Sequence, residues 1–251
     1  GGAVAIITEN IEPRKSIIDQ AAKLSAKLPK KKWALKCLDK LNDQEKYNFV
    51  LGWGLSFYKF NIKTNNKSSN INQTLCIKNI KDFIKEIGFK KFCAELKGIF
   101  LARDLINLPP NILTPYNYEK IVKNCFKDFS TKIDTYKDKK LEKNFPLINF
   151  VGRSSENKPL LLDIKWSKDK KNTFPNITLI GKGVTFDSGG LDVKPSSGMM
   201  LMKKDMGGSA VVLGIAYALI SMNCPVNLRV IIPMAENSIS DKSMRPLDVI
   251  Y

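Results

Sequence analysis

The stretch GKGVTFDSGGLDVKPSSGMMLMKKDMGG, from Gly181 to Gly208, joins an apolar run at 177–180 to a longer apolar run at 206–222. The first run has the length of a buried strand, and the second has the length of a helix. The glycine-rich segment between them carries several charged residues, among them Lys182, Asp187, Lys194 and Asp205. Unpaired charges beside apolar elements are costly to remove from water. A metal site is one arrangement that gives such charges a partner.

The runs around this stretch predict the fold class. Short apolar runs of strand type occur at 147–151, 160–166, 177–180 and 226–233, and the helix at 206–222 lies between the last two. A strand, crossover helix and strand in that order predict a parallel or mixed sheet with covered faces. We therefore expect an α/β protein in which Lys182 lies at the carboxyl end of a buried strand, where open α/β sheets bind ligands.

The N-terminal part is predicted to be a smaller α/β domain, with a boundary near residue 97 inside a long helix. Residues 1–97 form this domain and the linking helix, and residues 98–251 form the sheet-containing domain. A strand is predicted at 3–8, helices at 16–28, 43–57 and 82–108, a loop at 56–73 and a charged, solvated stretch at 132–144. Pro109 and Pro110 end the long helix, and Thr114 with Pro115 begins another that runs to about Phe126.

Composition narrows the class of function. The net charge is +17, and nearly all of the excess is lysine, which reads bases and phosphates less well than arginine. The lysines are spread along the chain, which disfavours nucleic acid as the main partner but leaves a basic nucleic-acid-binding protein open. The most apolar run, at 206–222, is opened by glycines and closed by Asn223 and Pro225, so a buried helix fits it better than a membrane span.

The cysteine and histidine counts exclude several kinds of site. The five cysteines are odd in number and widely spaced without a CxxC motif, which indicates a reducing compartment, and hence the cytoplasm. The chain has no histidine, which excludes Ser-His-Asp triads and HExxH zinc sites within it. Any metal must then be held by carboxylates and less usual ligands.

The charged residues of the segment at 181–208 are suited to a metal site. Asp187 and Asp205 come from separate segments at a sheet end and offer oxygen ligands to a divalent ion. Lys182 could coordinate only as a neutral amine, which burial and a nearby dication both favour. Lys194 would stay protonated and polarise a carbonyl group. Simpler roles stay open: Asp205 as a helix N-cap, Asp187 in a turn, and both lysines as solvated charges.

The whole run, with its spacings, resembles the signature of the leucyl (cytosol) aminopeptidases, the M17 family of two-metal exopeptidases. Further resemblance lies in three segments: ARDLIN with Asn111 and Thr114-Pro115, PMAEN at 233–237, and Arg245-Pro246. LGWG at 51–54, with Tyr58 and Phe60, is similar to the N-terminal part of some bacterial members. The resemblance covers most of the chain from about residue 50 onward.

The resemblance implies an activity and a set of roles. It implies a cytosolic metalloaminopeptidase that releases leucine-like N-terminal residues from peptides by a water activated between two divalent ions, Mn or Zn, in a homo-hexamer. Lys182, Asp187 and Asp205 would bind the metals, with Asp187 bridging them. Lys194 would be the catalytic lysine, and Met202 would line the pocket for the substrate's first side chain.

The chain departs from the family pattern in two places. The family continues with NTDAEGR, which supplies two more acidic ligands and an arginine, and these 251 residues contain no such segment. We therefore interpret the sequence as truncated before that motif and expect it to be inactive alone. A non-catalytic assembly subunit stays open as an alternative. Leu247 stands where the family has glycine in RPGD, a change expected to alter the turn and not the chemistry.

Overall fold

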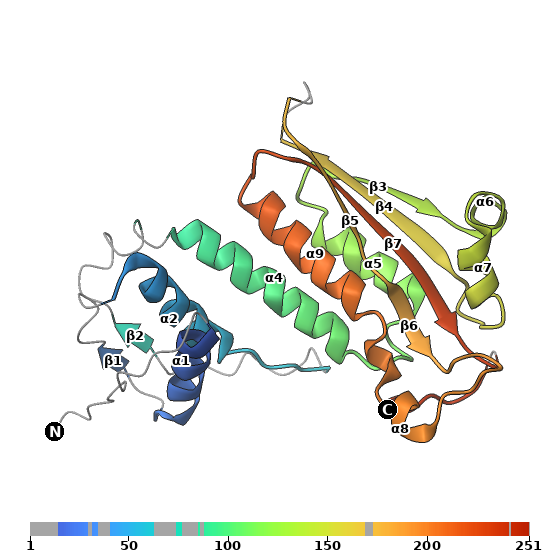
Figure 1. Cartoon of the computed structure of the whole chain (residues 1–251), viewed down its shortest axis with the longest axis horizontal. Coiled ribbons are helices and arrows are strands. Elements are labelled where there is room, and N and C mark those ends of the chain that lie inside the picture. The colour runs from blue at the N-terminus through green and yellow to red at the C-terminus, as the bar shows by residue number, and fades with distance from the viewer. Residues whose placement is uncertain are drawn as a thin grey trace. The chain divides into compact units, whose positions relative to one another are not determined.

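A computed structural model describes residues 15–29, 32–34, 41–62, 74–76, 85, 88–168, 173–240 and 242–250 (Figure 1). The predicted strand at 3–8 lies outside these residues, as does most of the predicted loop at 56–73. The chain divides into two compact units, Gly1–Leu96 and Lys97–Tyr251. The assignment of two domains with a boundary at residue 97 stays a prediction.

The first unit contains helices and a small parallel sheet. Its described elements are α1 (Lys15–Lys27), β1 (Lys32–Ala34), α2 (Asp43–Leu55), β2 (Thr74–Cys76) and the start of α4 (Phe89–Asn107). Ile17 and Ala21 of α1 pack against Phe49 and Trp53 of α2. Both predicted helices are confirmed. The predicted start of the long helix, at residue 82, lies outside the described residues; α4 begins at Phe89, directly after Gly88, whose φ of 64° interrupts a right-handed helix.

The second unit is built on a mixed sheet, in which the described residues form five strands. β3 (Lys132–Tyr136) runs antiparallel to β4 (Leu160–Ser167), which runs antiparallel to β7 (Asn227–Asn237). β5 (Asn176–Ile180) and β6 (Gly183–Asp187) both pair in parallel with β7, one after the other along its length. The predicted α/β class with a mixed sheet is confirmed.

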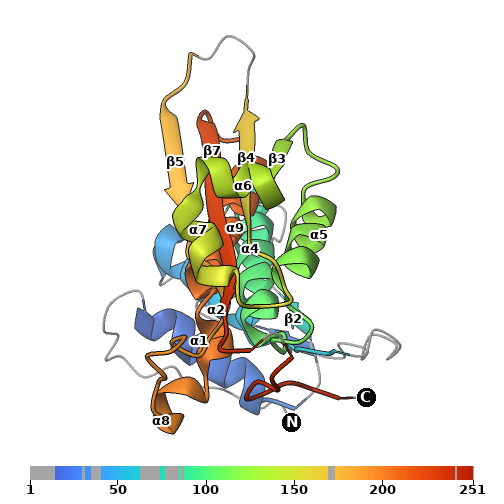
Figure 2. The same cartoon turned by 90° about the vertical axis from the view of Figure 1, so that its right-hand side faces the viewer.

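Helices cover both faces of this sheet (Figures 1 and 2). α4, α5 (Pro115–Cys125) and α9 (Gly207–Ser221) lie on one face, and α6 (Asp138–Asn144) and α7 (Pro146–Gly152) lie on the other. Alternate residues of the two central strands point into the main core: Leu160, Leu162, Ile164 and Trp166 of β4, and Leu228, Val230, Ile232 and Met234 of β7. This alternation is the period of two that a strand imposes.

Three predictions about this unit were wrong, and two elements in a fourth segment were not predicted. The run at 147–151 lies in the helix α7, because Pro146 takes the first helical position and a short apolar run does not by itself distinguish strand from helix. The charged stretch at 132–144 is mostly exposed or half-buried, as predicted, but it also forms β3 and α6, since an edge strand tolerates polar residues. Residues 183–187 form a strand rather than a loop. The strand before Lys182 is only half buried, with Ile180 68% exposed.

Two glycines set the closest contact between α4 and α9. A Cβ atom added to Gly98 would lie 2.4 Å from the carbonyl oxygen of Gly214, and one added to Gly214 would lie 2.5 Å from the oxygen of Gly98. No real Cβ atom tolerates such distances, so any larger residue would push the helices apart.

We predict that Gly214→Ala lowers the free energy of unfolding by about 1–3 kcal/mol, the usual cost of overpacking a close contact. Gly207→Ala is the matched control in the same helix, since its Cβ would meet only Ile106 Cδ1, at 4.0 Å. Its stability should be equal to that of the wild type or higher by up to about 1 kcal/mol. Urea titration of both variants measures this, and equal midpoints for Gly214→Ala and the wild type would contradict the contact.

Candidate functional site

An irregularity in the pairing of β6 with β7 sets the direction in which the Asp187 side chain points. Val184 pairs with Ala235 and Phe186 pairs with Glu236, so that Thr185 is an extra residue in β6. A bulge of this kind reverses the alternation of side chains beyond it. As a result Asp187 lies directly opposite Asn237, at the ends of both strands.

Two hydrogen bonds hold the Asp187 carboxylate, and both are accepted by the same oxygen, Oδ1. Its Oδ1 accepts from the backbone N–H of Gly189 at 3.0 Å and from the Asn237 amide at 2.7 Å. Its Oδ2 lies 3.0 Å from the Lys194 ammonium. Burial raises the pKa of Asp187, but Lys194, the Gly189 N–H and Asn237 together outweigh burial and hold this pKa below its usual range. Asp187 is therefore anionic at neutral pH, and it also closes the predicted turn.

Lys194 is the positive partner in this pair. Its hydrogen bond to Asp187 raises the pKa of the ammonium, and the charge of Asp205 contributes in the same direction. Lys194 is therefore protonated, as the sequence predicted. Lys194 therefore interacts electrostatically with both Asp187 and Asp205, so the two aspartates belong to one cluster of charges.

Lys182 and Asp205 form the second pair. Lys182 lies in the link between β5 and β6, and its carbonyl oxygen accepts from the N–H of Ser209 in α9 at 2.9 Å. Its Nζ lies 2.8 Å from Asp205 Oδ2. Asp205 follows the short turn η2 (Met202–Lys204) and does not cap α9, whose N-terminal residue has no side-chain cap. The N-cap role left open for Asp205 is thus excluded.

Asp205 Oδ2 is a buried polar atom of the site that forms an ion pair but no hydrogen bond with the described residues. It is fully buried, and the nearby Lys182 ammonium does not meet hydrogen-bond geometry, so the contact is an ion pair only. A buried carboxylate oxygen without a hydrogen bond is costly, and a cation is a partner that would satisfy it. The Lys182 side chain is 59% exposed.

The structure thus brings together four of the five predicted residues as two ion pairs. Two lysines supply the positive charge that a dication would supply to Asp187 and Asp205. Met202 lies half-buried in η2, one turn before Asp205. Within the described ranges, no three acidic or cysteine side chains gather closely enough to hold a metal without other ligands.

A shallow cavity of about 580 Å³ borders this cluster on the Asn237 side. Its walls come from α7, the 189–191 loop and residues 237–239, and neither Lys182, Asp205 nor Met202 lines it. The cavity therefore does not enclose the ion-pair cluster. The described helices include none with both the length and the apolar content that a membrane crossing requires.

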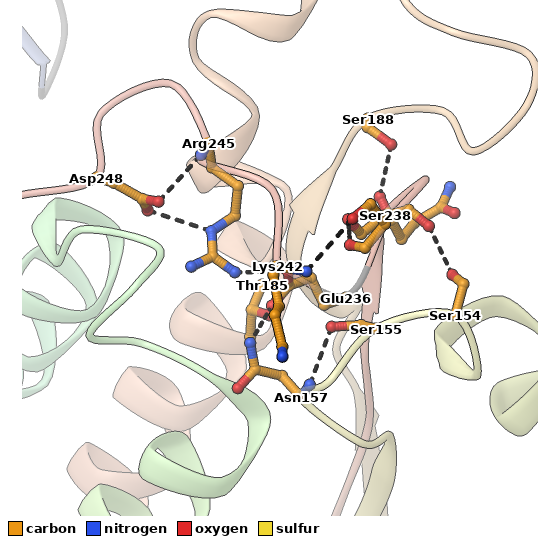
Figure 3. Close-up of polar contacts among 12 residues, drawn as sticks. Ser154, Ser155, Asn157, Thr185, Ser188, Glu236, Ser238, Lys242, Arg245 and Asp248 are labelled. Carbon is orange, nitrogen blue, oxygen red and sulfur yellow. Dashed lines mark hydrogen bonds and ion pairs between the residues drawn. The ribbon is translucent and has the colours of Figure 1, made fainter.

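A second buried network supports the ends of β6 and β7 (Figure 3). Glu236 accepts from Arg245 at 2.6 Å and from the Asn157 amide at 2.7 Å. Arg245 also binds Asp248 through its backbone N–H and its Nε. The sequence resemblance marked Glu236, Asn237 and Arg245 only as landmarks, and their hydrogen-bonding partners could not be read from spacing.

The chain was compared with known proteins. Residues 100–251 match the model of the cytosol aminopeptidase family, catalytic domain. A probable cytosol aminopeptidase of Wolbachia pipientis wMel is 36% identical over 196 residues, which cover 77% of this chain and 39% of the relative. The chain therefore spans about two fifths of the length of that curated relative.

Solved structures agree. The crystal structure of the cytosol aminopeptidase from Coxiella burnetii is 38% identical, with a TM-score of 0.79, over 94% of this chain and 49% of that one. The bottromycin maturation enzyme BotP, solved in complex with Mn, is 24% identical with a TM-score of 0.75, over 90% of this chain and 48% of that one. This second likeness concerns the fold alone.

We predict that Arg245→Leu lowers the free energy of unfolding by about 3–5 kcal/mol, because it leaves the Glu236 charge buried without its ion-pair partner. The double variant Glu236→Gln/Arg245→Leu should recover part of this loss, since no buried charge remains at position 236. Guanidinium titration compares the two. If they are equally unstable, the pairing of charges is not what Arg245 contributes.

We also predict that Leu247→Gly raises the free energy of unfolding by about 1 kcal/mol. Leu247 has a φ of 70°, a left-handed conformation that glycine adopts without strain and leucine does not. Leu247→Ala is the control, because it shortens the side chain and keeps the Cβ atom that causes the strain. Thermal unfolding should rank glycine above alanine; the reverse order would show that the turn is unstrained.

Proposed function

The chain belongs to the cytosol aminopeptidase family, and on this premise we propose that the full-length protein releases N-terminal amino acids from peptides in the cytoplasm. The observation that carries the proposal is the cluster of Asp187, Asp205, Lys182 and Lys194, in which a buried carboxylate oxygen lacks a hydrogen bond. The name of the relatives and the dispersed cysteines support the location.

Lys182, Asp187 and Asp205 would hold divalent metal ions, Mn or Zn. Carboxylate oxygens suit such ions, and Asp205 Oδ2, which is buried and held by an ion pair without a hydrogen bond, has the chemistry of a ligand atom. The lysines now balance the aspartate charges, so Lys182 would move from ion pairing to coordination as a neutral amine. When bound, two ions supply an activated water and polarise the scissile carbonyl.

The remaining residues act on the substrate. Lys194 is held beside Asp187 with a raised pKa, so it carries a full charge at neutral pH. An ammonium fixed in this way stabilises the negative oxygen that develops as the carbonyl is attacked. Met202, with its flexible apolar side chain, would line the pocket for a leucine-like first residue.

A non-catalytic assembly subunit is the second candidate. Its support is that the described residues bring together no three acidic or cysteine ligands. In that case metal uptake by the full-length product would be weak, whereas the 251 residues alone are expected to show little or no peptidase activity under either candidate. Both candidates share a proposed homo-hexamer, which sedimentation of the full-length product would test.

We predict that Asp187→Ala abolishes hydrolysis of leucine p-nitroanilide by the full-length product of the gene in the presence of Mn²⁺. Lys194→Ala should lower kcat by about 10²- to 10³-fold, the usual cost of losing one donor to an oxyanion. Lys204→Ala, an exposed lysine of the same stretch, is the matched control and should keep the wild-type rate. Addition of a chelator should stop the wild type.

Near-normal rates in Asp187→Ala would refute the metal-binding role. A wild-type protein that is inactive with every divalent ion tested would favour the assembly subunit.

A further inference from the structure

We propose that Asn237 is a positioning residue, whose amide orients the Asp187 carboxylate so that Oδ2 is the oxygen presented to a cation. This inference rests on the proposed function and deepens it. Asn237 touches neither Lys182 nor Asp205 in any recorded hydrogen bond or ion pair of the described residues, so its effect would act through Asp187.

The placement of Asn237 follows from the sheet. It is the last residue of β7 and pairs directly with Asp187, the last residue of β6. Directly opposed residues of neighbouring strands point to the same face, and the bulge at Thr185 is what brings Asp187 to that face. Without the bulge, the Asp187 carboxylate would point away from the amide.

The hydrogen bonds divide the carboxylate into two unequal oxygens. Oδ1 accepts two N–H groups, from Asn237 at 2.7 Å and from Gly189 at 3.0 Å, which fills its two lone pairs. Among the described residues, the recognised polar partner of Oδ2 is the Lys194 ammonium, at 3.0 Å. A cation that approaches Asp187 therefore meets Oδ2, and the amide decides which oxygen this is.

The orientation of the Asn237 amide is determined by its neighbours. The carboxylate accepts only, so the nitrogen must face it; the opposite orientation would set two acceptors 2.7 Å apart. The amide oxygen lies 3.2 Å from where a Cβ on Gly190 would be, and Gly190 has a φ of 70°. The carbonyl oxygen of Asn237 accepts from the N–H and the hydroxyl of Ser188, both at 2.9 Å. Asn237 is thus fixed before any ion arrives.

The test measures Mn²⁺ affinity of the full-length product by titration calorimetry. Asn237→Ala removes the donor, and Asn237→Leu removes it while it keeps most of the volume. Both should weaken Mn²⁺ binding by about 10- to 100-fold, the usual cost of losing a group that orients a metal ligand. Asn227→Ala is the matched control. Asn227 is a buried asparagine of the same strand, and its Nδ2 donates to the Phe174 carbonyl and to Asn176 at the far end of β7. Its Mn²⁺ affinity should stay within about twofold of the wild type.

Three results would overturn the proposal. Wild-type affinity in Asn237→Ala would mean that the amide does not orient the carboxylate. Restored affinity in Asn237→Leu alone would mean that Asn237 fills space. An equal loss in Asn227→Ala would mean that general destabilisation is responsible. If Asp187→Ala binds Mn²⁺ as the wild type does, the metal site and the proposed function fail together, whereas failure in Asn237→Ala alone leaves the proposed function intact.

Discussion

The parallel pairing of β6 with β7, offset by one residue at Thr185, is the constraint on which the rest of the site depends. The offset turns Asp187 toward Asn237, and the same strand end presents Glu236 to Arg245 and Asn157. β7 therefore carries two polar networks on successive residues, one for each face. The mixed sheet, with helices on both faces, supplies the rigid frame that holds these strand ends in register.

The charges held by this frame balance in two lysine–aspartate ion pairs, which bears on how the cluster could bind an ion. Asp187 and Asp205 are each paired with a lysine, so the cluster is neutral although it is partly buried. An ion that binds both aspartates would release one or both ammonium groups from pairing, and Lys194 would then be free to serve a substrate. The hydrogen bond from the Ser209 N–H of α9 to the Lys182 carbonyl oxygen links the start of this helix to the segment between β5 and β6.

Much of this could be predicted from the sequence, because strands 160–166 and 226–233 and the helix 206–222 have clear apolar patterns. The four clustered residues were also found, since their spacing matches a family signature. Three features could not be found. β6 has only five residues and begins with a glycine, α7 is a short apolar run that fits either element, and the bulge at Thr185 depends on register between strands distant in sequence. The role of Asn237 depends on that register, so it too emerged only from the structure.

The most direct test of the central claim is anomalous X-ray scattering from crystals of the full-length product grown with Mn²⁺. The account predicts peaks in contact with Asp187 Oδ2 and Asp205 Oδ2, with the Lys194 ammonium displaced from its ion pair with Asp187. Peaks elsewhere, or none while both lysines stay paired with the aspartates, would contradict it.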